Sequence, residues 1–184
     1  MTRLLSVAAL MVATVAGVAY AADLKSGPQT GENIPGPFHP MNITGPDAGK
    51  AVCLVCKNGG NPVAMVFARE TSPNLSKLVK KIDTLTAENK AAKMGSFVVF
   101  CSEDSKLEDS LKAMAKDQNL TNTVLSIDNP AGPESYEIAK DADVTVVLYN
   151  KHKVKANYAF KKGEMKETDV EKIVADISKI VPAK

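Results

Sequence analysis

The sequence has few of the residues that build metal centres and disulfide scaffolds. Its 184 residues include three cysteines, Cys53, Cys56 and Cys101, and two histidines, His39 and His152. Three cysteines are too few to staple a domain of this size, so the core must be hydrophobic. An odd number leaves at least one thiol unpaired within the chain. A closed zinc site needs four ligands, and the histidines lie far from the cysteine pair in sequence, which argues against such a site.

The chain also lacks a dense block of charge of either sign. Its 23 Lys and Arg residues are interspersed with its 21 Asp and Glu residues. This pattern argues against binding to nucleic acid or to an anionic membrane surface. No glycine-rich phosphate loop is present, and we expect no cofactor.

Only one apolar run approaches the length of a membrane span, and it lies at the start of the sequence. Residues 4–18 are apolar and uncharged, follow Arg3, and lead to an Ala-Tyr-Ala triplet that ends at Ala21. A membrane span needs about 20 apolar residues, whereas this pattern is typical of a signal peptide with small residues at the positions that the peptidase reads. We predict a signal peptide over residues 1–21, cleavage after Ala21, and an exported chain, periplasmic or extracellular, with no membrane span after cleavage.

Residues 22–50 are rich in glycine and proline, which favours an extended segment with several turns. We call these residues the lead-in segment. The folded domain is expected over residues 51–184. It would open with a short strand at 51–55, followed by a turn at Asn58-Gly59-Gly60-Asn61.

Beyond the turn, apolar patterns predict alternating strands and helices. Continuous apolar runs, typical of strands covered on both faces, occupy residues 63–67, 97–101 and 123–127. Apolar residues at a 3.6-residue period predict amphipathic helices that begin near Pro73, Leu107 and Thr168.

Local signals refine these elements. Ser72 is an expected N-cap with proline after it, and Ser105-Lys-Leu-Glu108 and Thr168-Asp-Val-Glu171 match capping boxes. Residues 144–149 and 154–160 form an expected hairpin closed around Lys151-His152, and a turn of helix is expected over residues 135–140. The order is β-α-β-α-β, a β-hairpin and a final helix, which predicts an α/β domain with a mixed sheet.

This order, over residues 31–181, resembles the thioredoxin-like fold and most closely its peroxiredoxin and redoxin branch. The stretches that carry the resemblance are GENIPGPF at 31–38, PVAMVFARETSPNL at 62–75 and DVTVVLYNKHKVKANYAFKKG at 143–163. C-L-x-C followed by P-V-x-x-V-F-A-R also resembles a group of exported bacterial proteins. The resemblance implies an α/β three-layer sandwich, with a mixed central sheet and helices on both faces.

The sequence departs from that family at the conventional redox site. Thioredoxins carry C-x-x-C on the first turn of the helix after the first central strand, where the helix dipole lowers a thiol pKa. Here Thr71-Ser72-Pro73-Asn74 occupies this place, so the chain is not a standard peroxiredoxin either. The cis-proline of the family is replaced by Val144-Thr145, and a cis bond before valine would cost about 2.5–4 kcal/mol. We expect the conventional site to be chemically silent.

Three alternatives remain for Cys53 and Cys56, which precede the first central strand instead of following it. If residues 51–57 are extended, the two side chains point to opposite faces and cannot bond. If they form a turn, a redox-active disulfide becomes feasible, and Lys50 and Lys57 would favour a thiolate. A pair that is only stabilising or buried is the second alternative, and a metal site is the third. Cys101, at the end of a buried strand, is expected to be a small buried hydrophobe at the opposite edge of the sheet.

The leading hypothesis is therefore an exported thioredoxin-like protein, a candidate thiol–disulfide oxidoreductase that works through Cys53 and Cys56 on a protein thiol or disulfide partner. From its first place in the motif, Cys53 would be the nucleophile and Cys56 the resolving thiol. One alternative is a non-catalytic binding or scaffold module of the same fold. The second is a Cu(I) or Zn carrier.

Overall fold

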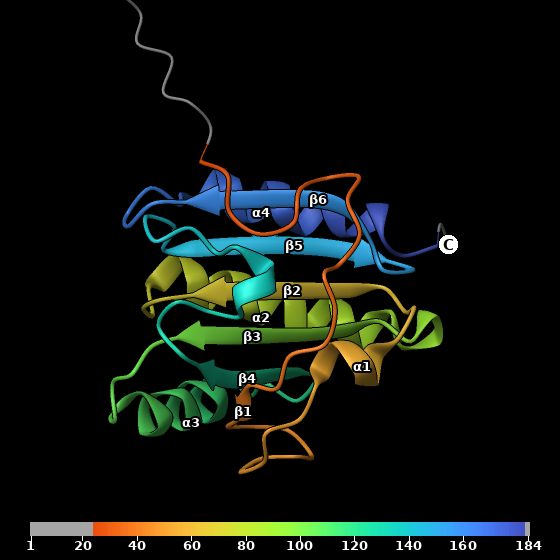
Figure 1. The fold of residues 1–184 in the computed structure, drawn as a ribbon. Helices are drawn as coiled ribbons and strands as arrows, with labels where there is room; N and C mark the ends of the chain where they lie inside the picture. The colour runs from red at the N-terminus through yellow and green to blue at the C-terminus, as the bar shows by residue number, and fades with distance from the viewer. Residues whose placement is uncertain (1–23, 183–184) are drawn as a thin grey trace, which may run out of the picture.

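The computed structural model describes residues 24–182, so the predicted signal peptide lies outside the described residues. A six-stranded sheet with the order β1-β4-β3-β2-β5-β6 forms its centre (Figure 1). β2, β3 and β4 are parallel, whereas β1, β5 and β6 each run antiparallel to their neighbours. The strands are β1 (Met41–Asn42), β2 (Val63–Ala68), β3 (Gly95–Cys101), β4 (Thr123–Asp128), β5 (Val144–Asn150) and β6 (Lys153–Phe160).

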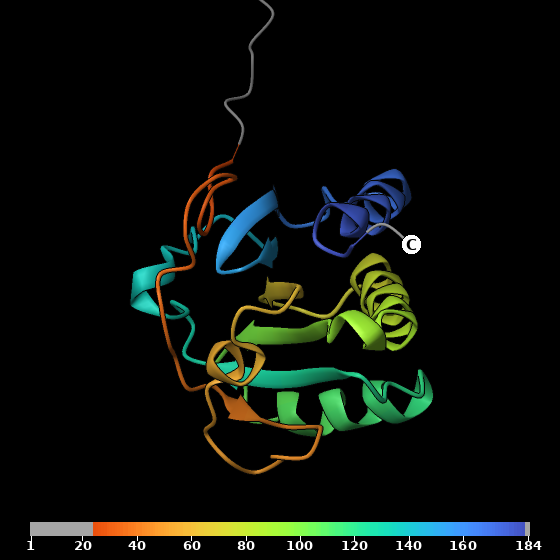
Figure 2. The same cartoon turned by 90° about the vertical axis from the view of Figure 1, so that its right-hand side faces the viewer.

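Helices cover both faces of this mixed sheet, unequally, which confirms the predicted fold class. α2, α3 and α4 pack on one face; α1, the short turn η2 and the lead-in segment lie on the other (Figure 2). Within residues 24–182, no helix combines the length and apolarity that crossing a membrane would require. The helices are α1 (Leu54–Asn58), α2 (Pro73–Glu88), α3 (Leu107–Asp117) and α4 (Glu167–Asp176), with 3-10 turns η1 (Lys90–Ala92), η2 (Glu134–Tyr136) and η3 (Ile177–Lys179).

The central strand β2 explains this arrangement. All six of its residues are buried. Because side chains alternate along a strand, Ala64, Val66 and Ala68 join the core under α2, α3 and α4, while Val63, Met65 and Phe67 join the second core. The apolar run in the sequence therefore indicated correctly that both faces of this strand are covered.

The second core is sealed by short elements. Ile34 and Phe38 from the lead-in segment are buried against it. The rings of Phe38 and Tyr136 meet edge to face with centroids 4.9 Å apart, and the Tyr136 hydroxyl donates a 2.7 Å hydrogen bond to the carbonyl of Gly36. The lead-in segment also contributes β1 to the sheet. The lead-in segment thus crosses the second face of the sheet from β6 to β4, before an exposed loop over residues 44–50 (Figure 1).

Two of the local predictions are confirmed and a third is wrong. Ser72 caps α2, accepting the Leu75 N–H at 3.2 Å, and the β5–β6 hairpin closes around Lys151 and His152 as predicted. The predicted strand at 51–55 is wrong: Ala51 makes one isolated bridge, and a helical turn follows.

Neither predicted capping box forms. α3 begins at Leu107 without a side-chain cap, because the Asp104 carboxylate accepts the Lys106 N–H at 2.9 Å. α4 begins earlier than predicted, with the Asp169 carboxylate accepting the Lys166 N–H at 2.8 Å. At each of these two helices, an aspartate carboxylate thus accepts the N–H of the residue just before the helix.

Arg69 fixes the loop that leads into β5. Its guanidinium donates three hydrogen bonds to backbone carbonyls, to Ala142 at 2.9 Å, to Pro130 at 2.6 Å and to Ala139 at 3.1 Å. The planar fork of arginine can reach several acceptors at once. One side chain at the end of β2 therefore determines the path of residues 130–142.

We predict that Arg69→Ala lowers the free energy of unfolding by about 2–3 kcal/mol, because three carbonyls, two of them partly buried, lose a charged donor. Urea titration followed by circular dichroism measures the change. Arg69→Lys should recover only part of the loss, since an ammonium cannot span all three acceptors. A stability for Arg69→Ala within about 0.5 kcal/mol of wild type would contradict this role.

Candidate disulfide site

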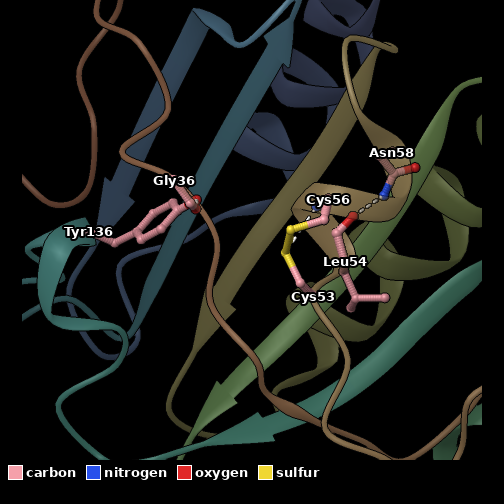
Figure 3. The surroundings of a disulfide bond; sticks show 6 residues. All are labelled: Gly36, Cys53, Leu54, Cys56, Asn58 and Tyr136. Carbon is pink, nitrogen blue, oxygen red and sulfur yellow. Dashed lines mark hydrogen bonds between the residues drawn. A yellow bond between two sulfur atoms is a disulfide. The ribbon is translucent and has the colours of Figure 1, made fainter.

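Cys53 and Cys56 form a disulfide on the helical turn α1 (Figure 3). Residues three apart on a helical turn share a face, and here the two Cα atoms are 5.3 Å apart. An extended backbone would have placed the two side chains on opposite faces. Of the alternatives left open by the sequence, the turn is the one that the chain adopts.

The two sulfurs sit in different environments. Cys53 is the N-cap of α1 and only 6% exposed, and its Sγ accepts the backbone N–H of Cys56 at 3.0 Å. Cys56 is exposed to solvent. The neighbours Leu54 and Val55 are each 5% exposed and anchor α1 in the second core. The second core therefore fixes the turn that carries the disulfide, and of the two cysteines only Cys56 is exposed to solvent.

The end of α1 is locked by Asn58 and Gly59. The Asn58 side chain donates to the carbonyl of Leu54 at 2.8 Å, as drawn in Figure 3. Gly59 ends the helix with a φ of 52°, a conformation that favours glycine, and its N–H returns to Val55. Read as a helix end, Asn58-Gly59 would have indicated a turn of helix before it in the sequence.

The site lies where β2 and β3 begin. Asn58 packs so closely on Gly95, the first residue of β3, that a Cβ there would lie 1.8 Å from the Asn58 Oδ1. The disulfide therefore occupies the edge of the sheet opposite to the start of α2, as the sequence predicts. We call this edge the strand-start end; it lies on the right in Figure 1.

Lys57 and Asp47 connect α1 to the lead-in segment. They form an ion pair whose side chains are 47% and 21% exposed. Sequence reasoning singled out Lys57 as a basic neighbour of the thiols but missed Asp47, which lies ten positions earlier and carries no local signal. Lys50, the other flanking lysine, is exposed.

The conventional redox corner is formed, but without a thiol. Thr71, Ser72, Pro73 and Asn74 line a groove of about 380 Å³ at the start of α2, together with Val144 and the loop after β6. The peptide bond before Val144 is trans, as are all peptide bonds in residues 24–182. This corner can receive a ligand, but none of these side chains can carry out disulfide exchange.

Acidic groups line the same groove. Burial raises the pKa of the Asp143 carboxyl, and the nearby Glu70 raises it further, while Lys162 and Arg69 oppose the shift. Lys162 forms an ion pair with Glu70 at 2.6 Å. The groove thus carries charged groups of both signs, which the apolar bed beneath the disulfide lacks.

Cys101 is a buried free thiol at the end of β3. It is 4% exposed, and burial raises its pKa to about 11, with Arg69 opposing the shift and Asp128 adding to it. A Cβ on Gly132 would lie 3.2 Å from its sulfur, so the thiol is tightly enclosed. Below pH 10 it is therefore a neutral, inaccessible side chain, as the sequence suggested.

The two histidines do not join the cysteines. His39 and His152 are exposed, and among residues 24–182 no three His, Cys, Asp or Glu side chains gather closely enough to hold a metal ion. A metal bound through Cys53 and Cys56 would thus need both cysteines as reduced thiolates, with any further ligands supplied from outside residues 24–182.

We predict that Cys101 resists alkylation in the native protein. At pH 8 the oxidised protein should take up no iodoacetamide label over one hour, and one label per chain after unfolding in guanidinium, because burial keeps the thiol protonated and covered. Intact mass spectrometry reads the number of labels, with Cys101→Ala as the unlabelled control. Rapid native labelling at Cys101 would contradict its burial.

Comparison with known proteins identifies the fold. No protein-family model matches the chain, and no curated protein sequence resembles it significantly. Solved structures do: a candidate protein disulfide isomerase from Bacteroides thetaiotaomicron (TM-score 0.63, 19% identity, covering 86% of this chain and 94% of that one) and a thiol:disulfide interchange protein from a Bacteroides species (0.57, 20%, 84% and 92%). The peroxidoxin BcpB from Mycobacterium tuberculosis is similar too (0.57, 15%, 84% and 99%).

At these identities the likeness establishes the fold and nothing finer. The chain has a thioredoxin-like fold. Its one disulfide within residues 24–182 is Cys53–Cys56, at the strand-start end.

Proposed function

We propose that this protein carries out thiol–disulfide exchange through Cys53 and Cys56, and that the conventional corner around Pro73 takes no chemical part. The observation that carries the proposal is a closed C-x-x-C disulfide with one sulfur exposed to solvent and the other buried. An incoming thiolate needs access to one sulfur of a disulfide, and this bond provides it. The partner would be a protein thiol or disulfide.

Two further features support this proposal. The Cys53 sulfur already accepts an N–H, and a hydrogen bond to the charged form favours the thiolate that reduction would create. The fold is also one in which solved disulfide-exchange proteins occur, including the thiol:disulfide interchange protein from Bacteroides. Neither feature by itself would distinguish a working pair from a structural one.

A reduction potential distinguishes the two. We predict that the pair equilibrates reversibly with glutathione or dithiothreitol buffers, with a potential between about −120 and −270 mV, the range of known exchange proteins. Thiol quantification by mass spectrometry across the redox series measures it. Cys53→Ser and Cys56→Ser should each abolish the couple, while Cys101→Ala should leave it intact. A pair that stays oxidised down to the most reducing buffer would instead be structural.

A non-catalytic binding module is the second candidate function. The groove of about 380 Å³ at the start of α2 favours it, because it offers the charged groups Glu70, Asp143 and Lys162 to a ligand without a thiol. In that case the disulfide only fastens α1, and removing it would change stability alone. The redox titration separates this candidate from the first.

A Cu(I) or Zn carrier is the third candidate. Two reduced cysteines suit Cu(I), whose soft character matches thiolates. Stoichiometric copper or zinc retained by the reduced protein, and lost in Cys53→Ser, would favour it over both others.

We also propose that residues 1–21 direct export and are removed, and that residues 22–50 form a lead-in segment that completes the thioredoxin-like domain of residues 51–184 by adding β1 and part of the second core. We predict a secreted or periplasmic product that begins at Ala22, because Ala21 closes the small-residue triplet that a signal peptidase recognises. N-terminal sequencing of the exported fraction checks the cleavage site. Ala21→Arg should block processing, and a mature product that still begins at Met1 would refute the assignment.

A further inference from the structure

Resting on the proposed function, we infer that the disulfide is opened at Cys56 rather than at Cys53, by an acidic thiol-bearing protein that docks on the strand-start end. The first argument is access. Cys53 is 6% exposed and covered by the second core, whereas Cys56 faces solvent. A macromolecular thiol can therefore reach only the second sulfur of the motif. This order is the reverse of the one that position in the motif suggests.

The second argument concerns the leaving group. Attack on Cys56 expels Cys53 as a thiolate, and a better-stabilised thiolate leaves faster. The Cys53 Sγ already accepts the Cys56 N–H at 3.0 Å, so a donor is in place for the charge as it forms. Attack on Cys53 would expel Cys56 instead, whose sulfur accepts no hydrogen bond among those of the described residues. Hydrogen bonding and access thus both favour attack on Cys56, with Cys53 as the leaving thiolate.

The third argument is charge around the exposed sulfur. Lys57 adjoins Cys56 in the chain, and Lys151 lies beside the end of the α1 turn, its N–H bonded to the carbonyl of Gly60 at 3.1 Å. Lys153 is also exposed at this end, where it bridges to Asn33 of the lead-in segment.

Two acidic groups lie close to this end. Asp47 offsets the charge of Lys57, whereas the Glu32 carboxylate, which accepts the N–H of Gln29 at 2.7 Å, keeps its charge. The exposed lysines Lys151 and Lys153 outnumber Glu32, and their charge favours a partner with acidic residues around its thiol.

The opposite end of the sheet carries a different charge. Glu70 follows β2, Asp104 lies in the loop after β3, Asp128 ends β4, and Asp141 and Asp143 precede β5. Basic side chains there are partly neutralised, as in the Lys162–Glu70 pair. At the conventional corner itself, Glu70 and Asp143 lie beside Lys161 and Lys162, so this corner offers an acidic partner no excess of positive charge. Charge and thiol placement agree on the same docking surface.

The exchange balances as two substitutions at sulfur. A partner thiolate attacks the Cys56 Sγ; a partner–Cys56 disulfide forms, the Cys53–Cys56 bond breaks, and Cys53 keeps the electron pair as a thiolate. A second thiolate of the partner then attacks the partner sulfur of this mixed disulfide and releases Cys56 as a thiolate. The partner dithiol is oxidised by two electrons, the pair is reduced by two, and the two protons lost by the partner thiols can be taken up by Cys53 and Cys56.

Single-cysteine variants test the polarity. Cys53→Ser and Cys56→Ser, both in a Cys101→Ala background, are mixed with a cysteine hexapeptide activated as its thionitrobenzoate disulfide, and the release of thionitrobenzoate is followed by absorbance. Cys53→Ser, which keeps the exposed thiol, should form the mixed disulfide at least about tenfold faster than Cys56→Ser, because access limits thiol exchange. Equal rates, or a faster Cys56→Ser, would overturn the assignment.

Peptide charge tests the docking surface. At a low salt concentration of about 20 mM, Cys53→Ser should react about tenfold faster with a peptide rich in aspartate than with one rich in lysine. A salt concentration of about 0.5 M should remove most of this preference. Lys151→Glu in the same variant should reduce the preference several-fold. Lys140→Glu, an identical charge change at the far end, should leave it within about twofold.

These outcomes are separable from failure of the proposed function. No charge preference, or the same loss from Lys140→Glu as from Lys151→Glu, would refute the acidic partner even if the wild-type pair shows a reversible potential. A pair that cannot be reduced would refute the proposed function itself, whatever the single-cysteine rates.

Discussion

The structure depends on the need to cover both faces of the central strands. β2 has six consecutive buried residues, so a sheet with α2, α3 and α4 on one face would leave a wide apolar surface exposed on the other. Within residues 24–182, no long helix covers that second face. It is sealed instead by the lead-in segment, the turn η2 and α1, which together bury a core that includes Phe38, Phe67 and Tyr136. The disulfide belongs to this cover, which gives it a firm apolar base.

The two ends of the sheet have different properties. At one end Arg69 binds three carbonyls of the loop before β5, and the groove beside it retains the shape of a redox corner without its sulfur. At the other end α1 presents a disulfide between lysines. A thioredoxin-like fold thus does not fix where a disulfide lies, which depends on the residues placed at each end.

The sequence predicted the features that depend on local pattern. Runs such as Val63–Phe67 predicted buried strands, Ser72 with Pro73 predicted the start of α2, and Lys151-His152 predicted the hairpin. It failed where two patterns compete: the apolar pair Leu54 and Val55 suggested a strand, although both are buried on one helical turn. Nor could it tell which cysteine would be exposed, because that depends on how α1 packs against a core assembled from distant segments.

The short span of the disulfide has one more consequence. Cys53 and Cys56 are three positions apart, so their bond closes a very small ring and restricts the unfolded chain little, by about 2 kcal/mol on the chain-entropy account. A bond that joined distant segments would withdraw more freedom and would have to remain closed for the molecule to stay folded. Here Leu54 and Val55, each 5% exposed, also anchor the turn in the second core, so the disulfide is not its sole fastening.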